Sequence, residues 1–182
     1  MKINKTEIDD LLVIEPNLYT DNRGWFSETY NLDVFQENGI DIKFIQDNHS
    51  YSTNKGVLRG LHFQKNPKAQ TKLVRCTRGS IWDVAVDLRK SSPTYLKWFG
   101  IELTADNHKM LLVPKGFAHG LITLECDSEV QYKVDNFYDK YADCSIRYND
   151  PSIGIKWPQI DVILSDKDMN APLLKDSDVK FL

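Results

Sequence analysis

The stretch Ser80-Ile-Trp-Asp-Val-Ala-Val-Asp-Leu88 gives the clearest prediction of the fold class. Apolar and β-branched side chains dominate it, and glycine precedes it while two basic residues follow it, which is typical of a strand. Similar runs follow at residues 95–103, Met110–Val113 and Ser128–Val134, each closed by turn-forming residues. Many short strands separated by tight turns favour an all-β fold, and we expect a jelly-roll β-sandwich or barrel.

Two segments outside this strand-rich region have a different pattern. Asn31-Leu-Asp-Val-Phe-Gln-Glu-Asn-Gly39 predicts a short helix, because asparagine is a good N-cap and glycine commonly ends a helix. From Asp150 onward, prolines interrupt the chain repeatedly, yet many apolar residues remain. We therefore expect few short helices and a wrapped C-terminal segment packed on the sandwich. Its apolar residues are Ile155, Trp157, Ile160, Val162 and Leu164.

Length and composition favour one folded unit. The chain has 182 residues and a mass of 21.0 kDa, with 41% hydrophobic and 27% charged residues. No linker-like cluster of proline and glycine appears, so we expect a single domain over residues 1–182. The formal net charge of −3 disfavours a general nucleic-acid-binding protein, which is normally basic.

The sequence also predicts where the protein works. No run approaches about 18 apolar residues, so we expect no membrane-spanning helix. The N-terminal stretch turns acidic where a signal peptide needs apolar residues, which favours a cytoplasmic protein. Cys76, Cys126 and Cys144 lie far apart without metal-type spacing, and they fit reduced thiols that pack as small hydrophobic residues.

Two glycine-marked motifs contain histidine. Gly56-Val-Leu-Arg-Gly-Leu-His-Phe-Gln64 carries Arg59 and His62 between apolar residues, and Val113-Pro-Lys-Gly-Phe-Ala-His-Gly120 carries His119. One such histidine alone is more often a hydrogen-bonded structural residue, but two in one sandwich favour a site. His49 and His108 lie in polar, loop-like surroundings, where we expect structural roles.

The two motifs resemble those of the cupin superfamily, whose metal-binding members have His-x-His, then Glu, then a later His after Pro-x-Gly. The second motif fits at His119, but Gln64 stands where the first motif needs its second histidine. Residues 65–68 supply no carboxylate. Two neutral histidines are a poor transition-metal site, so we expect no metal.

A histidine without metal points to proton transfer. Such a base needs a carboxylate to orient it, and Asp83, Asp87 and Asp168 are the candidates. Lys72, in the middle of a predicted strand, is either a solvated residue or the cation that stabilises an anion. Tyr132 shares a strand face with two valines and is either a core residue or a proton donor.

A second polar set suits a phosphate-containing ligand, since the guanidinium fork matches phosphate oxygens. No phosphate-binding loop and no Gly-x-Gly-x-x-Gly sequence occurs, so side chains rather than a helix N-terminus would hold a nucleotide. We expect no dinucleotide cofactor. The set comprises Arg23, Gln46, Asn48 and Arg59.

Together these motifs resemble the dTDP-4-dehydrorhamnose 3,5-epimerase family, which are metal-free cupins. The resemblance runs from about residue 13 to residue 172, and the order and spacing of its motifs make it specific. It implies a cupin-type jelly roll and a nucleotide-sugar substrate. Its further signatures include Asp21-Asn-Arg-Gly-Trp-Phe-Ser-Glu28, Gln46-Asp-Asn-His-Ser50, Lys72-Leu-Val-Arg75, Ser92-Pro-Thr94, Asn149-Asp-Pro151, Trp157-Pro158 and Leu164-Ser-Asp-Lys-Asp168.

The resemblance also implies roles for individual residues. His62 matches the general base, Asp168 its orienting carboxylate, Tyr132 the acid on the opposite sugar face, and Lys72 the cation beside the C4 carbonyl. Other positions match those that hold substrate: Arg23, Phe26, Glu28, Gln46, Asn48, Arg59, His119, Phe137, Asp143 and Lys167. Three positions depart from the family pattern: Phe137 replaces a stacking tyrosine, Asp143 replaces a glutamate, and Tyr148 replaces a tryptophan.

The implied activity is epimerisation at C3 and C5 of a 4-keto sugar nucleotide through enolates. A related 3- or 5-epimerase, a ketoisomerase and a non-catalytic sugar-nucleotide-binding cupin are the alternatives. The resemblance further implies a homodimer that exchanges N-terminal strands, because Leu11-Leu-Val-Ile14 would otherwise form an exposed sheet edge.

Overall fold

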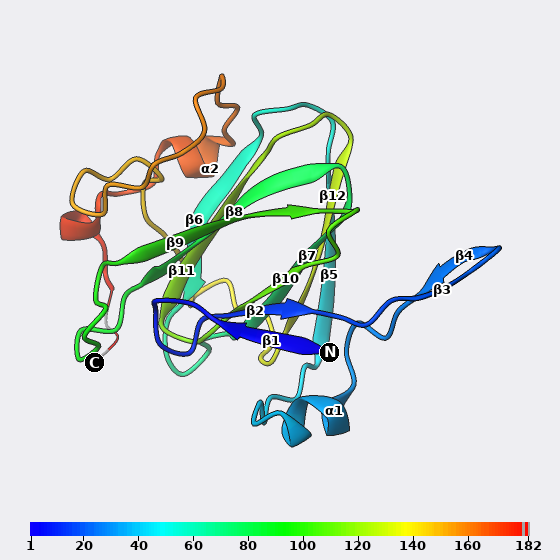
Figure 1. The fold of residues 1–182 in the computed structure, drawn as a ribbon. Coiled ribbons are helices and arrows are strands. Elements are labelled where there is room, and N and C mark those ends of the chain that lie inside the picture. Colours follow the sequence, from blue (N-terminus) through cyan, green and yellow to red (C-terminus); the bar gives the residue numbers. More distant parts are fainter. Residues whose placement is uncertain (180, 182) are drawn as a thin grey trace.

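The computed structural model describes residues 1–179 and 181 and contains two antiparallel sheets packed face to face (Figure 1). Successive strands largely alternate between the sheets, as in a jelly roll, and the sheets stay separate, so the fold is a sandwich and not a closed barrel. The six-stranded sheet has the order β1 (Lys2–Lys5), β2 (Leu12–Glu15), β10 (Met110–Val113), β7 (Lys72–Arg78), β12 (Ser128–Val134) and β5 (Gln46–Ser52). The five-stranded sheet has the order β13 (Asp143–Ser145), β6 (Leu58–Gln64), β11 (Phe117–Thr123), β8 (Ser80–Asp87) and β9 (Trp98–Thr104).

The strand predictions are confirmed with one correction. Strands β8, β10 and β12 occupy the predicted runs, and Val130 and Val134 are buried on the inner face of β12. Strand β9 begins at Trp98 instead of residue 95. Ser92 and Thr94 hydrogen-bond to the buried Asp87 carboxylate, and this tight connection occupies the residues before the strand.

The core between the sheets explains why these strands pack. Inward-facing residues of both sheets, such as Val74, Ile81, Leu111 and Val130, form one buried apolar cluster. Burying such side chains stabilises the fold by roughly 1.5–3 kcal/mol each. Polar side chains also line a cavity between the sheets, where the candidate site lies.

The predicted helix is α1 (Leu32–Glu37). The Asn31 side chain accepts a hydrogen bond from the backbone N–H of Asp33 at 3.0 Å, as an N-cap should. Phe35 is fully buried against Ile14 and Leu73, so α1 covers part of the outer face of the six-stranded sheet. Among the residues that the structure describes, no helix is long and apolar enough to cross a membrane.

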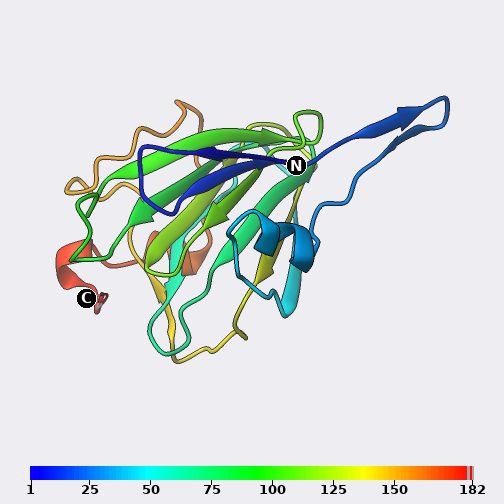
Figure 2. The same cartoon turned by 60° about the horizontal axis from the view of Figure 1, so that its bottom comes forward.

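A two-stranded hairpin formed by β3 (Tyr19–Asp21) and β4 (Gly24–Phe26) projects away from the sandwich (Figures 1 and 2). Every residue of both strands is exposed. An isolated hairpin is marginally stable in water at best, so this one needs a surface to pack on.

The N-terminal run was expected to form an exposed edge, and this expectation is wrong. Strand β2 lies between β1 and β10, and Leu11 and Ile14 are fully buried. The sheet edge belongs instead to β1, whose sequence is mostly polar.

The C-terminal segment wraps the sandwich as predicted. Ile163 forms a bridge with Val57, and Phe181 forms one with Arg89. Ile153, Val179 and Phe181 are buried against the five-stranded sheet. The segment contains the one-turn helix α2 (Asp166–Met169) and the 3-10 helix η1 (Leu174–Asp176), and α2 contacts β6.

Candidate functional site

The four predicted catalytic residues meet at one cavity between the sheets. The cavity has a volume of about 430 Å³, and it receives His62 from β6, Lys72 from β7, Tyr132 from β12 and Asp168 from α2. Its other lining residues are Ser50, Val57, Leu58, Arg59, His119, Leu121, Ile163, Leu164 and Ser165.

Two glycines shape the strand that carries His62. A Cβ added at Gly60 would lie 2.6 Å from the Cα of Gly120 on β11, so only glycine allows these backbones to approach. The register between β6 and β11 shifts at this point, between His119 and Leu121. The irregularity places Arg59 and His62 on the same cavity, although an unbroken strand would point them to opposite faces.

His62 and Asp168 form a dyad. His62 Nε2 lies 2.5 Å from Asp168 Oδ1, and Ser165 Oγ donates to Asp168 Oδ2 at 3.0 Å. Burial disfavours the Asp168 charge, but hydrogen bonds from His62 and Ser165 and the backbone N–H of Gly60 outweigh it and hold the pKa of Asp168 below its ordinary value. An ionised Asp168 accepts from Nε2–H, so the lone pair of the neutral ring lies on Nδ1.

The structure gives each of the three carboxylates proposed as partners of a catalytic histidine a different partner. Asp168 binds His62, and Asp83 Oδ1 lies 2.8 Å from His119 Nε2. Asp87 instead accepts hydrogen bonds from Arg89, Ser92 and Thr94, outside the cavity. The cavity therefore holds two histidine–aspartate pairs, and His62 and His119 are direct neighbours across β6 and β11.

Lys72 is an unpaired cation in a poorly hydrated place. Its side chain lines the cavity, and no hydrogen bond or ion pair reaches its Nζ from the residues that the structure describes. Burial lowers the pKa of Lys72 from 10.5 to about 8, while the Asp83 and Asp143 carboxylates oppose this only in part. The interpretation of Lys72 as a solvated residue is wrong, and its placement is suited to stabilising an incoming negative charge.

The position of Tyr132 is compatible with both of its proposed roles. Its ring packs against the inner core cluster, and it also lines the cavity. The Lys72 Nζ lies 6.0 Å from the centroid of this ring. Burial raises the pKa of Tyr132, so its hydroxyl stays protonated at neutral pH and is able to donate a proton.

We call the polar side chains of β5 and β6 at this cavity its mouth: Arg59 lines the cavity, and Gln46 and Asn48 lie on the same face of β5 as the lining residue Ser50. Gln46 Nε2 donates to Asn48 Oδ1 at 3.0 Å, and Asn48 lies opposite Tyr132 in the register. Arg59 donates to the backbone carbonyl of Tyr51 and to Ser52 Oγ, both at 3.2 Å. These groups share the cavity face and are positioned to hold a polar ligand.

Three further predicted residues lie beside this mouth. Lys167 Nζ lies 2.5 Å from Asp143 Oδ2, so these two residues form an ion pair. Phe137 is 60% exposed in the loop after β12, which leaves its ring face free to stack on a planar ligand.

Gln64, which replaces a metal-ligating histidine of other cupins, has a structural role. Its amide donates to the carbonyls of Lys68 and Phe137 and accepts from the backbone N–H of Asp139 at 2.7 Å. Gln64 thereby anchors the loop that carries Phe137. Among the described residues, no three His, Cys, Asp or Glu side chains converge as a metal site requires.

Three predicted substrate residues lie apart from the cavity in the single chain. Arg23 and Phe26 are on the projecting hairpin, where Arg23 pairs with Asp21 at 2.5 Å. Glu28 is exposed in the segment after the hairpin and accepts a hydrogen bond from Asn31. The structure does not bring these residues to His62 within one chain.

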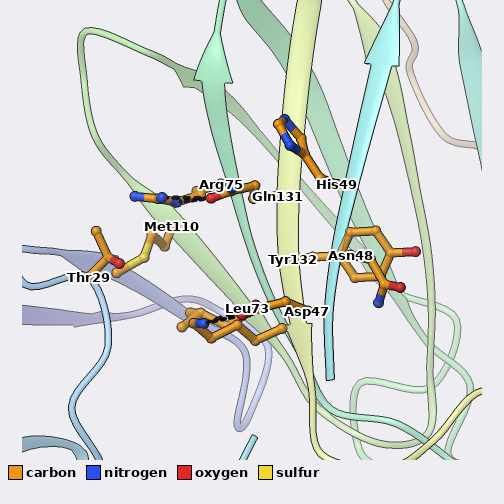
Figure 3. A pocket seen from close by; sticks show the side chains of 10 residues that line it. Thr29, Asp47, Asn48, His49, Leu73, Arg75, Met110, Gln131 and Tyr132 are labelled. Carbon is orange, nitrogen blue, oxygen red and sulfur yellow. Dashed lines mark hydrogen bonds and ion pairs between the residues drawn. The ribbon is translucent and has the colours of Figure 1, made fainter. Parts of the chain in front are cut away.

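A smaller pocket of about 160 Å³ lies on the outer face of the six-stranded sheet. Figure 3 shows Arg75 bonded to Gln131, whose Oε1 atom accepts hydrogen bonds from the guanidinium Nη2 and Nε atoms at 2.6 and 3.2 Å. The side chains of Tyr132 and Asn48 point away from Arg75 and Met110 in Figure 3, and Tyr132 also lines the catalytic cavity. The charged side chains Arg75, Asp47 and Lys133 of the outer pocket are thus already paired, Arg75 with Gln131 and Lys133 with Asp47.

Two of the remaining histidines and cysteines differ from expectation, because His49 lies on strand β5 and not in a loop, and Cys126 is exposed. His49 pairs with Glu129 at 3.0 Å, and the ring of His108 lies 4.6 Å from that of Trp25. Cys76 is buried, whereas Cys126 is exposed and so does not pack as a small hydrophobic residue.

Sequence reasoning missed Ser165 and Ser50. Ser165 caps α2 and binds Asp168, and a serine three residues before an acidic residue is a recognisable helix start that would have indicated this role. Ser50 lines the cavity only because β5 pairs with β12, a long-range contact that no local pattern reveals.

The chain is similar to one protein family over nearly its whole length. A family model described as dTDP-4-dehydrorhamnose 3,5-epimerase matches residues 5–176. A dTDP-4-dehydrorhamnose 3,5-epimerase of Shigella flexneri is 51% identical over 179 residues, covering 98% of each chain.

Two solved structures are also similar. The dTDP-4-dehydrorhamnose 3,5-epimerase of Bacillus anthracis, with TDP and PPi bound, is 52% identical with a TM-score of 0.93, covering 95% of this chain and 99% of that one. The dTDP-6-deoxy-D-glucose-3,5-epimerase of Legionella pneumophila, in complex with dTDP-4-keto-L-rhamnose, is 43% identical with a TM-score of 0.94, covering 100% and 96%. The expected fold class is confirmed, and this chain belongs to the dTDP-4-dehydrorhamnose 3,5-epimerase family.

Proposed function

We propose that this chain converts dTDP-4-dehydro-6-deoxy-D-glucose into dTDP-4-dehydro-L-rhamnose by epimerising C3 and C5, a step of dTDP-L-rhamnose biosynthesis. The observation that carries the proposal is the meeting of the His62–Asp168 dyad with the unpaired Lys72 cation in one cavity. Residues 1–182 act as one catalytic unit in this proposal. The reaction moves protons without net oxidation, so it requires no electron acceptor.

The first step removes a proton from a carbon next to the C4 ketone. His62, oriented by Asp168, accepts this proton, and the electron pair of the broken C–H bond moves onto the C4 oxygen. The Lys72 ammonium stabilises the resulting enolate, as a preorganised charge in a poorly hydrated site does well. Both C3 and C5 flank the ketone, so the same enolate chemistry serves each carbon.

The second step returns a proton to the opposite face of the carbon, which inverts it. Tyr132 is the proposed donor, because it lines the cavity from β12 while His62 comes from β6 in the other sheet. The two proton-transfer groups therefore approach the cavity from opposite sheets.

Replacing Tyr132 with phenylalanine should separate proton exchange from product formation. His62 would still form the enolate and return a proton to the original face, so solvent deuterium would enter the substrate faster than product appears. The measurement is deuterium at C3 and C5 against product formed over the same time.

Tyr51→Phe is the matched control, since Tyr51 lies on the neighbouring strand β5 and donates its hydroxyl to Asp127 away from the cavity. This control should leave both rates unchanged. A fall of exchange and product by the same factor in Tyr132→Phe would speak against the two-face assignment.

Substrate recognition would use the polar mouth of the cavity. Phe137 would stack on the thymine ring, and the cations at the mouth would bind the diphosphate. Phe137 lacks the hydroxyl of the tyrosine that it replaces, but its ring is still able to stack. The proposed substrate-binding residues within the chain are Gln46, Asn48, Arg59, His119, Phe137, Asp143 and Lys167.

We further propose a homodimer in which the hairpin of one chain completes the cavity of the other. Tyr19, Trp25 and Phe26 are 61%, 57% and 69% exposed, and such a set of aromatic side chains favours an interface. The hairpin also carries Arg23 and Phe26, which match substrate-binding positions yet lie away from the cavity of their own chain. Strands β1 and β2 pair within the chain, which supports the hairpin, in place of exchanged N-terminal strands, as the proposed segment that reaches the partner.

Mixing two inactive variants tests this arrangement. Arg23→Ala and His62→Ala should each lose most activity, but a mixed dimer would combine an intact His62 with an Arg23 supplied by the partner. After subunit exchange, activity should recover to about a quarter of the wild-type value, because half of the dimers are mixed and each has one complete site. Light scattering should give twice the 21.0 kDa chain mass. A mixture no more active than its parts, or a 21.0 kDa species alone, contradicts the proposal.

A product assay tests the function itself. The purified chain, kept in a metal chelator, is incubated with dTDP-4-dehydro-6-deoxy-D-glucose, and the product sugar is identified by NMR. Conversion to the 4-dehydro-L-rhamnose form supports the proposal. A product inverted at one carbon indicates a 3- or 5-epimerase, and an unchanged sugar indicates a binding protein.

A further inference from the structure

Asp83 is a buried carboxylate that the proposed mechanism does not use. It lies on β8 and is 0% exposed. Its neighbours at alternate positions, Ile81 and Ala85, belong to the core cluster between the sheets, so Asp83 faces inward with them. A carboxylate is rarely placed so deeply unless something compensates its charge.

Hydrogen bonding compensates only half of this carboxylate. Oδ1 is bonded to His119 Nε2 at 2.8 Å, while Oδ2 is buried without a hydrogen-bond partner among the described residues. His119 itself lines the cavity beside Lys72. Among the described residues, the Asp83 Oδ2 atom and the Lys72 Nζ atom therefore both lack a hydrogen-bond or ion-pair partner.

We propose that Asp83 is a positioning residue that fixes the His119 ring and keeps the Lys72 side chain positively charged in the cavity. This inference rests on the proposed function, because the charge of Lys72 matters for stabilising the C4 oxyanion. Among the charged groups that act on Lys72, Asp83 has the largest favourable effect, ahead of Asp143. Charges in a protein interior are screened less than charges in bulk water, so a buried carboxylate acts on a nearby ammonium group.

Other groups around Lys72 also affect its charge and must stay constant in a test. Lys167 on α2 opposes the charge, and Asp143 on β13 supports it. The remaining titratable or charged groups at the cavity are Arg59 and His62 from β6, His119 from β11, Tyr132 from β12 and Asp168 from α2. Asp83→Asn leaves all of these in place and preserves the size of the side chain.

The experiment compares Asp83→Asn with Asp87→Asn. Asp87 is the matched control, since it is equally buried on the same strand but binds Arg89, Ser92 and Thr94 outside the cavity. In Asp83→Asn, the alkaline limb of the kcat/KM profile should move to lower pH by about one unit, because a supporting charge has been removed. In Asp87→Asn the limb should stay in place, even if the protein becomes less stable.

A second measurement uses no substrate. The acylation of Lys72 by acetic anhydride is followed across pH by mass spectrometry, and its midpoint should fall by the same amount in Asp83→Asn alone. If neither the alkaline limb nor this midpoint moves, the inference is overturned. If wild-type protein has no epimerase activity but the midpoint still moves, the proposed function fails and the role of Asp83 stands.

A double variant covers the case in which Asp83→Asn does not fold. Asp83→Asn/Lys72→Met removes both charges together. Recovery of folded protein would support the inference, because it would show that the uncompensated Lys72 charge caused the failure. A double variant that also fails to fold would assign Asp83 to packing alone and overturn the inference.

Discussion

Replacing His62 with alanine should lower kcat by about 10³-fold or more, because the general base starts both epimerisations. Deuterium exchange at C3 and C5 should fall with it, since no enolate forms. The variant also leaves the buried Asp168 without its main partner, so a moderate loss of stability is expected. Steady-state kinetics and the melting temperature together separate the chemical effect from unfolding.

His49→Ala is the control for this variant. His49 lies on the outer face of the six-stranded sheet and pairs with Glu129, so its loss should leave kcat unchanged. If His62→Ala keeps the wild-type exchange rate while folded, the base lies elsewhere, and His119 becomes the candidate.

Replacing Lys72 with methionine should have opposite effects on activity and stability. Without the cation at the C4 oxygen, kcat should fall by about 10²–10³-fold. The same change removes a charge that is costly to bury, so the free energy of unfolding at pH 7 should rise by up to about 3 kcal/mol. The chain would then be more stable and less active.

The pH dependence of this stability gain has a definite sign. The folded-state pKa of Lys72 is about 8, against 10.5 ordinarily, so between these values the unfolded chain binds more protons than the folded one. Wild-type stability therefore rises with pH across this window, and the advantage of Lys72→Met shrinks as pH approaches 10.5. Urea unfolding at pH 7 and pH 10 measures the difference.

Lys133→Met is the matched control. Lys133 is adjacent to Tyr132 on β12 but lines the outer pocket, where it pairs with Asp47, so both activity and stability should change little. A Lys72→Met protein that is destabilised at pH 7, or that retains wild-type kcat, would contradict the role given to this cation.

Local sequence pattern was sufficient for most of the fold. The alternation in β12 and the apolar run of β10 predicted both strands, and Asn31 predicted the start of α1. These features depend on residues that are close together in the sequence, so the local pattern of residues predicts them. The start of β9 was predicted wrongly, because Asp87 draws Ser92 and Thr94 into a turn that apolar periodicity does not record.

Long-range features of the site could not be predicted from the residues alone. Asp168 is 106 positions from His62, and only the wrapped C-terminal segment brings it there, so three carboxylates stayed open as partners. The resemblance to a known family selected Asp168. The local sequence pattern also could not predict that the hairpin projects from the sandwich. A projecting hairpin and a packed hairpin have the same alternation of side chains along their strands.

Proton exchange in D2O tests the central claim most directly. Wild-type protein is incubated with dTDP-4-dehydro-6-deoxy-D-glucose, and deuterium is located by NMR. The account predicts deuterium at both C3 and C5, together with the inverted product. Deuterium at one carbon only, or none at either carbon, would contradict it.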